Sequence, residues 1–342
     1  MPGDVLGIGL IGAGRIGRLH ATHLARQVRR ARLVAIADPV ESLARTCAAE
    51  VGVSSVDLDY RRLLERPEVD AVVICSSTDT HAPIIGEAAA AGKQVFCEKP
   101  IALSLESIDH ALAAVERAGV KLQVGFNRRF DTSFQRVRQA VENGEVGQPW
   151  LLRITSRDPE PPPLDYIRVS GGLFLDMMIH DFDMARYLIG SEVDEVYTRA
   201  AVLVDEQIGA AGDVDTAVVV LSFENGVIGT IDNNRRAVYG YDQRVELLGS
   251  GGMVATTNNY PNSAVLSTEQ SVRRDLPLHF FLERYRDSYL VEMTAFVEAI
   301  LDDRPTPVDG RDGRLPVVMG LAALRSHQEH RPVRLAEIDA VS

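Results

Sequence analysis

The sequence predicts an α/β protein of two domains, in which a parallel sheet with alternating helices is followed by an α+β domain. At 342 residues the chain is too long for a single ordinary hydrophobic core. Short apolar runs alternate with segments of helical spacing up to residue 125, and strand-like segments dominate after it. We therefore expect domains of residues 1–125 and 126–342, with the last helices able to pack back on the first domain.

In the first domain, apolar runs of strand length are separated by segments of helical length. Strands separated by such helices form βαβ units, which build a parallel sheet. The sheet strands in such a domain are buried and nearly continuously apolar. The expected strands are Val5–Ile11, Leu33–Ala37, Ala71–Cys75, Gln94–Cys97 and Lys121–Gly125, and the expected helices span 15–28, 40–51, 84–91 and 104–118.

The second domain is richer in strands. The dipeptide Asn225-Gly226 between two of them is a common hairpin turn, which favours antiparallel pairing. We therefore predict a large, mostly antiparallel sheet. Its expected strands span 150–156, 195–204, 214–223, 227–236, 243–249 and 253–257, with helices near 131–143, 171–190, 280–302 and 311–328.

Composition narrows the class of protein. The formal net charge of −12 repels phosphate backbones, so we expect no nucleic-acid partner. No apolar run approaches the roughly 20 residues of a membrane span, and no secretory signal is evident, so we expect a cytoplasmic protein. The three cysteines form no CxxC pair, which favours reduced and mostly buried thiols.

A glycine motif, Gly12-x-Gly14-x-x-Gly17, lies between the first strand and the first helix and predicts a Rossmann dinucleotide site. Gly12 permits the tight turn, Gly14 lets backbone amides approach the pyrophosphate, and Gly17 allows close packing. Asp38 ends the next strand, 21 residues after Gly17. Its carboxylate suits the ribose hydroxyls and repels a 2′-phosphate, so NAD is favoured over NADP, although Arg15 could help to hold a phosphate.

Two further segments contain ionisable side chains at positions that favour a functional site. Glu98-Lys99-Pro100 follows a predicted strand, at the edge where open α/β sheets bind ligands. Asp176 and His180 are four residues apart, so they share one face of a predicted helix.

These motifs together resemble the Gfo/Idh/MocA oxidoreductases over nearly the whole chain. The glycine motif, Thr78-Asp-Thr-His81, Glu-Lys-Pro and the pattern GG-x3-D-x3-H-x2-D beginning at Gly171 occur in the order of that family. Details around Arg128–Asp131 and Tyr239–Asp242 are most similar to its inositol 2-dehydrogenases. The resemblance implies a two-domain fold, NAD as cofactor and usually a homotetramer built through an open sheet. It also implies oxidation of the axial hydroxyl of myo-inositol to 2-keto-myo-inositol.

The resemblance implies a catalytic trio of Lys99, Asp176 and His180. Removing hydride from an alcohol acidifies its hydroxyl, and the unperturbed imidazole pKa of about 6.5 suits a general base, so His180 takes that part. Asp176 would orient the imidazole, and Lys99 would hydrogen-bond the substrate oxygen. Because a lysine already supplies positive charge at that oxygen, we expect no metal.

The remaining candidates divide between cofactor and substrate. Arg129 could instead form an interface ion pair, the tyrosines could simply pack, and we expect Tyr239 and Tyr241 to share one strand face. His20 and His23 are assigned to the core, with no acidic partner evident nearby. The expected cofactor contacts are Gly12, Gly14, Arg15, Ile16, Gly17, Asp38, Thr78, His81, Glu98 and Lys99, and the expected substrate contacts are Arg129, Asp158, Tyr239, Tyr241 and Tyr289.

Two alternatives remain at this point. One is another activity of the same family, on a pyranose sugar or a different inositol isomer. The other is a non-catalytic NAD(H)-binding sensor, because Rossmann folds host many functions. A sensor has no reason to combine Lys99, Asp176 and His180.

Overall fold

The computed structural model describes residues 5–340 of the chain, which divides into two compact units. Unit 1 takes in the chain up to Asn127 and then Asp287–Val317, and unit 2 takes in Arg128–Arg286 and the chain from Val318 onward. The sequence placed the boundary near residue 125 and left open a return of the last helices. In the structure, the segment 287–317 belongs to unit 1.

Unit 1 is built on a six-stranded parallel sheet, as expected of a Rossmann domain. The strands follow the order β3-β2-β1-β4-β5-β6, so the direction of winding reverses between β1 and β4. Ligands bind in such sheets at the carboxyl ends of the strands beside this reversal. The strands are β1 (Leu6–Ile11), β2 (Ala31–Ala37), β3 (Val56–Asp57), β4 (Ala71–Ile74), β5 (Gln94–Glu98) and β6 (Leu122–Gly125).

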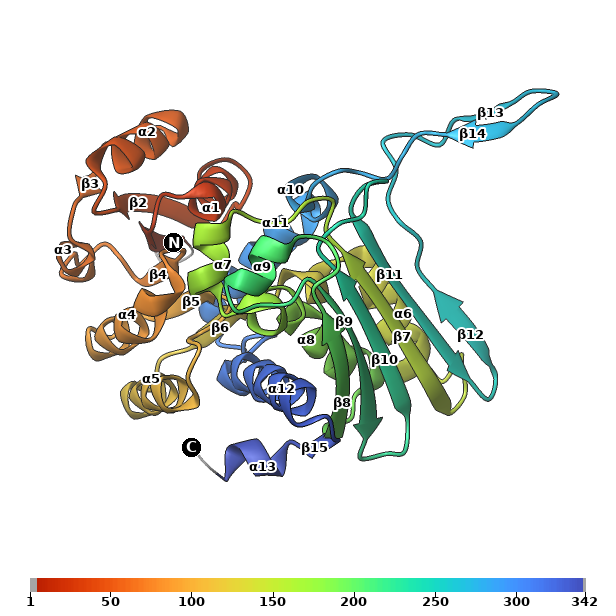
Figure 1. Cartoon of the computed structure of the whole chain (residues 1–342). Coiled ribbons are helices and arrows are strands. Elements are labelled where there is room, and N and C mark those ends of the chain that lie inside the picture. Colours follow the sequence, from red (N-terminus) through yellow and green to blue (C-terminus); the bar gives the residue numbers. More distant parts are fainter. Residues whose placement is uncertain (1–4, 341–342) are drawn as a thin grey trace. The chain divides into compact units, whose positions relative to one another are not determined.

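Helices cover both faces of this sheet (Figure 1). One layer contains α1 (Arg15–Arg26), α2 (Glu41–Val51) and α11 (Arg286–Leu301), which share a hydrophobic core with the strands. Phe96 of β5 and Phe296 of α11 meet edge to face inside this core, with ring centroids 5.7 Å apart. The second layer pairs α4 (Thr78–Ala90) with α5 (Leu105–Ala118), and α3 (Tyr60–Leu64) lies between β3 and β4 in the chain.

Unit 2 is built on a seven-stranded sheet in the order β12-β11-β7-β10-β9-β8-β15, in which β7 and β10 are parallel and the other pairs antiparallel. This confirms the predicted mostly antiparallel sheet. The strands are β7 (Pro149–Arg157), β8 (Val193–Ala201), β9 (Thr216–Phe223), β10 (Ile228–Asn234), β11 (Asp242–Gly249), β12 (Gly252–Ala255) and β15 (Val333–Arg334).

Burial alternates along β9 and β11, so one face of this sheet is covered and the other is open. The covered face packs against α6 (Thr132–Glu142) and α8 (Ile179–Ile189) (Figure 1). The unit also contains the short helices η1 (Asn127–Phe130, shared with unit 1), α7 (Leu164–Ser170), α9 (Glu206–Ala210), α10 (Phe281–Arg284) and α13 (Ala336–Asp339), while α12 (Gly310–Glu329) runs from unit 1 into unit 2.

The expected helix at 171–190 is interrupted. Gly171 and Gly172 both have positive φ, at 88° and 73°, and a π-helical turn, η2 (Leu173–Met177), precedes α8. The amide of Met178 donates to the carbonyl of Leu173, a span of five residues instead of four. Asp176 therefore lies in the π turn and His180 in the first turn of α8, so the assumption of one uniform helix was wrong.

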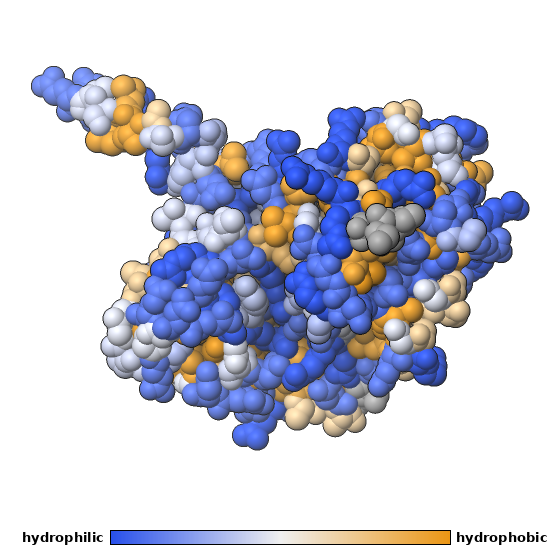
Figure 2. Space-filling view, turned by 180° about the vertical axis from the view of Figure 1, so that it is seen from behind, coloured by the Kyte–Doolittle hydropathy of each residue, from blue (hydrophilic) through white to orange (hydrophobic). Residues whose placement is uncertain are grey.

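An exposed arm extends from the sheet of unit 2, and the sequence did not predict it. It carries the two-stranded hairpin of β13 (Val265–Ser267) and β14 (Val272–Arg274), which pair with each other in a sheet of their own. Val265, Leu266 and Val272 are each more than half exposed, and Figure 2 shows hydrophobic residues on the arm among hydrophilic ones. Within residues 5–340, no helix is both long enough and apolar enough to cross a membrane.

Candidate active site

The three motif glycines have the geometry that dinucleotide binding requires. Gly12 has a φ of 95°, and a Cβ there would lie 2.6 Å from the backbone of Cys75 and Ser76. A Cβ on Gly17 would lie 1.9 Å from the carbonyl oxygen of Gly12. A Cβ on Gly14, by contrast, would meet no protein atom within 4 Å. The first two glycines are needed for packing, and Gly14 leaves open space beside the loop for a ligand.

The N-terminus of α1 is prepared for an anion. Gly14 is its N-cap, no side chain caps it, and its first turn carries no acidic residue. Backbone amides and the helix dipole at such a terminus favour a phosphate group. The loop residues thus fit the pyrophosphate of a dinucleotide.

Asp38 holds the glycine loop from the end of β2. Its Oδ2 accepts a hydrogen bond from the Ala13 amide at 2.7 Å, and its Oδ1 accepts one from the Val40 amide at 2.8 Å. Each carboxylate oxygen has a second lone pair, which leaves acceptor capacity for ribose hydroxyls. Asp38 therefore has a role that the sequence did not predict, in fixing the loop.

Lys99 follows the last residue of β5 directly, at the carboxyl edge of the parallel sheet. Both of its chain neighbours are held by buried histidines. The Nε2 of His20 lies 2.7 Å from Oε1 of Glu98, and the Nδ1 of His81 lies 2.8 Å from the carbonyl oxygen of Pro100. Thr78 begins α4 and is partly buried, three residues before His81.

Asp176 and His180 lie in unit 2, and both are partly buried. Asp176 accepts a hydrogen bond from the hydroxyl of Tyr166 at 2.9 Å, and Nη1 of Arg235 lies 3.7 Å from its Oδ2. Neither neighbour was predicted from the sequence. Tyr166 lies in the short helix α7, and Arg235 follows β10, so neither is close to Asp176 in a recognisable motif.

Arg235 is a fully buried cation facing two carboxylates. Its Nη2 lies 3.6 Å from Oδ2 of Asp213, and Asp213 in turn accepts a hydrogen bond from the amide of Leu173 at the start of the π turn. A buried charge is tolerated where opposite charges lie nearby. Arg235 thus supports Asp176 from the interior of unit 2.

A second buried network lies beside Asp176. Arg128 donates to Asp181 at 2.6 Å, and Asn233 donates to the other oxygen of Asp181 at 2.9 Å. Burial, opposed by the nearby Arg235 and Arg128 and assisted by the carboxylates of Asp176 and Asp181, raises the pKa of Asp158 to about 6. A carboxyl with that pKa changes its charge close to neutral pH.

Arg129 forms an ion pair, but not the interface ion pair that the sequence left open, and its contact with a polyol stays a prediction. Its guanidinium forms a nearly buried ion pair with Asp183 of α8, with Nη2 and Oδ1 2.6 Å apart, and stacks over the ring of Tyr187. The partner lies in the same unit, so this pair does not cross between domains.

The tyrosine candidates lie in different environments. Tyr241 is buried, whereas Tyr239 is 37% exposed and donates its hydroxyl proton to Asp242. The expectation that both share one strand face was wrong, because Gly240 has a φ of 120° and places them in a turn before β11. Tyr289 belongs to α11 in unit 1 and is buried with its ring edge to face against His20.

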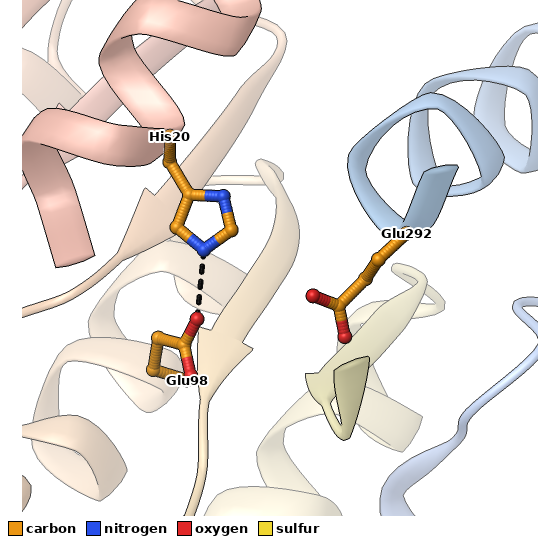
Figure 3. A group of neighbouring side chains, drawn as sticks. All are labelled: His20, Glu98 and Glu292. Atoms are coloured by element: carbon orange, nitrogen blue, oxygen red, sulfur yellow. Dashed lines mark hydrogen bonds and ion pairs between the residues drawn. The ribbon is translucent and has the colours of Figure 1, made fainter. Parts of the chain in front are cut away.

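His20 is part of a buried cluster that the sequence analysis did not find. We expected no acidic partner, yet Glu98 and Glu292 both lie beside it (Figure 3). Glu292 comes from α11, 272 residues further along the chain than His20, so no local spacing could reveal it.

Two family models match the chain. One, described as an oxidoreductase family with an NAD-binding Rossmann fold, matches residues 6–126. The other, described as the GFO/IDH/MocA C-terminal domain, matches residues 134–255.

Known proteins resemble the chain over nearly its whole length. A myo-inositol 2-dehydrogenase of Thermotoga maritima is 53% identical over 97% of this chain and 99% of the relative. An inositol 2-dehydrogenase of Rhizobium meliloti is 46% identical over 96% of this chain and 98% of the relative. The crystal structure of scyllo-inositol dehydrogenase from Lactobacillus casei with bound NAD(H) and scyllo-inositol superposes with a TM-score of 0.91 at 31% identity, covering 97% of this chain and 99% of that one.

Proposed function

Because the chain belongs to the GFO/IDH/MocA family of NAD-binding oxidoreductases, we propose that it oxidises myo-inositol to 2-keto-myo-inositol with NAD⁺ as the hydride acceptor. The observation that carries the proposal is the full-length similarity to two inositol 2-dehydrogenases in a chain that has Lys99, Asp176 and His180 together. The three free cysteines suit a reducing compartment, and we place the enzyme in the cytoplasm.

The reaction separates a hydride from a proton. Bound NAD⁺ supplies the hydride acceptor for the substrate carbon. His180 accepts the hydroxyl proton, Asp176 stabilises the imidazolium that results, and Lys99 hydrogen-bonds the oxygen as it becomes a carbonyl. Arg235 and Tyr166 keep the carboxylate of Asp176 in place through the contacts described above. In the reverse direction His180 returns the proton.

The two units would supply different ligand contacts. In unit 1 the cofactor would contact the glycine loop (Gly12–Gly17), Asp38, Thr78, His81 and the segment Glu98-Lys99. In unit 2 the cyclitol would contact Asp158, the tyrosines near β11 and Arg129, whose guanidinium is held by Asp183. Tyr289 is buried against His20 in unit 1, and its contact with the substrate stays a prediction.

We also propose that the protein is a homotetramer joined through the open face of the seven-stranded sheet. Leu151, Ile228 and Leu248 are paired across neighbouring strands and form one exposed apolar row on that face. Contiguous exposed apolar surface of this kind is typical of an interface between subunits. The exposed apolar side chains of Val265, Leu266 and Val272 on the arm add further surface for a second copy of the chain.

The first experiment mixes the protein with NAD⁺ and follows the absorbance of NADH over myo-inositol, scyllo-inositol, D-chiro-inositol, glucose, xylose and galactose, and repeats the set with NADP⁺. We expect the highest kcat/KM for myo-inositol with NAD⁺. The relative of known structure with bound scyllo-inositol makes that isomer the main competitor. Preference for a pyranose would move the substrate to another activity of the family.

The Lys99→Ala variant tests whether Lys99 takes part in catalysis and not in cofactor binding. We expect loss of turnover with NADH binding largely intact, because Lys99 acts on the substrate oxygen and not on the pyrophosphate. Measurable NADH binding by the wild type without turnover of any polyol or sugar would favour a sensor over an enzyme.

A further inference from the structure

A buried cluster in unit 1 includes Glu98, the residue that precedes Lys99 in the chain. His20 of α1, Glu98 of β5 and Glu292 of α11 each present a ligand atom, and these three atoms lie within 4.8 Å of one another. Figure 3 shows the imidazole above Glu98 and the carboxylate of Glu292 pointing toward the pair from the facing helix. Three elements that are distant in sequence thus converge on the residue that precedes Lys99.

The orientation of His20 is fixed on every side. Its ring is fully buried and packs edge to face against Phe96 at 5.3 Å and Tyr289 at 5.7 Å between centroids. Its Nε2 donates to Oε1 of Glu98 at 2.7 Å, the length of a charge-assisted hydrogen bond. Its Nδ1 has no hydrogen-bond partner within the described chain, which fits the tautomer that carries its proton on Nε2.

The other oxygen of Glu98 is held by close packing. A Cβ on Gly125 of β6 would lie 2.9 Å from Oε2 of Glu98 and 3.1 Å from its Cα. Gly125 therefore has to lack a side chain for the carboxylate to occupy this position. The Glu98 side chain has one bonded oxygen and one oxygen packed against the neighbouring strand, so it has little freedom to move.

A second histidine holds the chain on the far side of Lys99. His81 is buried, and its Nδ1 and Nε2 lie 2.8 Å and 3.1 Å from the carbonyl oxygens of Pro100 and Ser76. Burial lowers the pKa of His81, so the ring is neutral at pH 7 and has one N–H to donate. We assign that proton to Nδ1, which has the shorter contact, with Pro100.

We propose that His20 and His81 are positioning residues that hold the Glu98 side chain and the Pro100 carbonyl on the two sides of Lys99 as a clamp, and so aim its ammonium group at the reacting oxygen. The inference rests on the proposed function, in which Lys99 contacts that oxygen. A lysine side chain has four methylene groups and many conformations, so its direction depends on a fixed starting point. Donors act on the transition state at about 2.7–3.1 Å, and a misplacement of about 1 Å can lower the rate a hundredfold.

The test compares His20→Leu with His20→Gln. Leucine removes the hydrogen bond to Glu98, whereas the glutamine amide can replace the Nε2 donor. We expect His20→Leu to lower kcat by about 10- to 100-fold with KM and NADH affinity changed less than about threefold, and His20→Gln to recover most of kcat. His81→Leu should lower kcat in the same way, but NADH affinity is not its readout, because His81 is also a proposed cofactor contact.

His23→Leu is the matched control, because His23 is also buried and lies one turn further along α1. Gly125→Ala is a second route to the same effect, since it displaces Glu98 without altering His20. An equal loss of kcat in His23→Leu, or unchanged kcat in both His20→Leu and Gly125→Ala, would refute the clamp.

Hydrogen exchange of the peptide spanning residues 94–102 tests the clamp without relying on turnover. We expect faster exchange in His20→Leu than in the wild type and His20→Gln. Should the wild type prove inactive on every polyol, the proposed function fails while this measurement still decides the clamp. Metal analysis of the purified protein completes the test: a stoichiometric divalent cation lost in Glu292→Gln would overturn the clamp in favour of a metal site.

Discussion

At the scale of single residues, the carboxylate of Asp176 depends on a buried cation, since Nη1 of Arg235 lies 3.7 Å from its Oδ2. Lys99, Asp176 and His180 were found because each belongs to a motif whose members are close in sequence. Arg235 follows Asp176 by 59 residues, and its position depends on how β10 pairs with its neighbours in the folded sheet. The residues of the proposed catalytic trio were thus accessible from the sequence, whereas neighbours such as Arg235 required the structure.

Asp38 determines the choice of cofactor in our proposal. Asp38→Ala removes a negative charge from the ribose site, so we expect the ratio of kcat/KM for NADP⁺ to that for NAD⁺ to rise at least about tenfold. The variant also loses the acceptors of the Ala13 and Val40 amides, so its melting temperature should be measured in parallel. Asp57→Ala, at the end of the neighbouring strand β3, is the control, and an unchanged ratio in Asp38→Ala would remove Asp38 from the ribose site.

Asp158 makes unit 2 sensitive to pH. Because burial raises its pKa from 3.8 to about 6, the folded state favours the neutral carboxyl, and stability is lost as the pH rises from about 4 through 6. Asp158→Asn removes that loss, so we expect its melting temperature to exceed that of the wild type by about 2–6 °C at pH 8 and to match it near pH 4. Thermal unfolding followed by circular dichroism measures both.

Asp165→Asn provides the comparison, because that carboxylate is 97% exposed. It should leave the melting temperature unchanged at both pH values. A difference for Asp158→Asn that is the same at pH 4 and pH 8 would show that the carboxyl is not the titrating group.

At the scale of elements, length decided what could be predicted. The long strands and helices have enough periods for their patterns to be read, and their positions were close to those observed. Elements such as β3, α3, α9 and β15 have five residues or fewer and show no period. The π turn η2 was not predicted, because its five residues differ from an α-helix in their hydrogen bonding and not in their composition.

The π turn depends on Gly172. Its φ of 73° disfavours any side chain, and a Cβ there would lie 2.5 Å from Oδ1 of Asp213. Gly172→Ala should therefore displace the turn that carries Asp176, and we expect kcat to fall at least about tenfold with NADH affinity unchanged.

Gly226→Ala is the matched control for Gly172→Ala. It has a similar positive φ of 86° but no atom within 4 Å of the added Cβ. It should cost about 1 kcal/mol of stability and leave kcat near that of the wild type. Similar kinetics in the two variants would show that backbone strain, and not the contact with Asp213, governs the effect.

At the scale of the whole molecule, the fold class followed from the alternation of elements, while the apolar row proposed as an interface depends on strand register. The sequence has Leu151, Ile228 and Leu248 in three separate strands, and only the pairing of β7 with β10 and β11 brings them into one row. The arm of β13 and β14 was missed because its two strands have three residues each.

Placing a charge in this row tests the proposed tetramer. We expect Ile228→Asp to reduce the molar mass measured by light scattering, because an unpaired carboxylate would be buried between subunits. Val169→Asp serves as the comparison, since Val169 is 67% exposed in unit 2 and lies outside the row. A wild-type monomer, or a tetramer that survives Ile228→Asp, would exclude this face as the interface.

Unit 1 is built from two separate segments of the chain, and this affects its folding during synthesis on the ribosome. The core of its parallel sheet includes Met293, Phe296 and Val297 of α11, which are translated about 160 residues after Asn127. At a translation rate of roughly 5–20 residues per second, the strands of the Rossmann sheet are synthesised about 10–30 s before the helix that completes their core. During that interval the growing chain exposes an apolar surface, which makes it a substrate for chaperones until the last quarter of the polypeptide emerges.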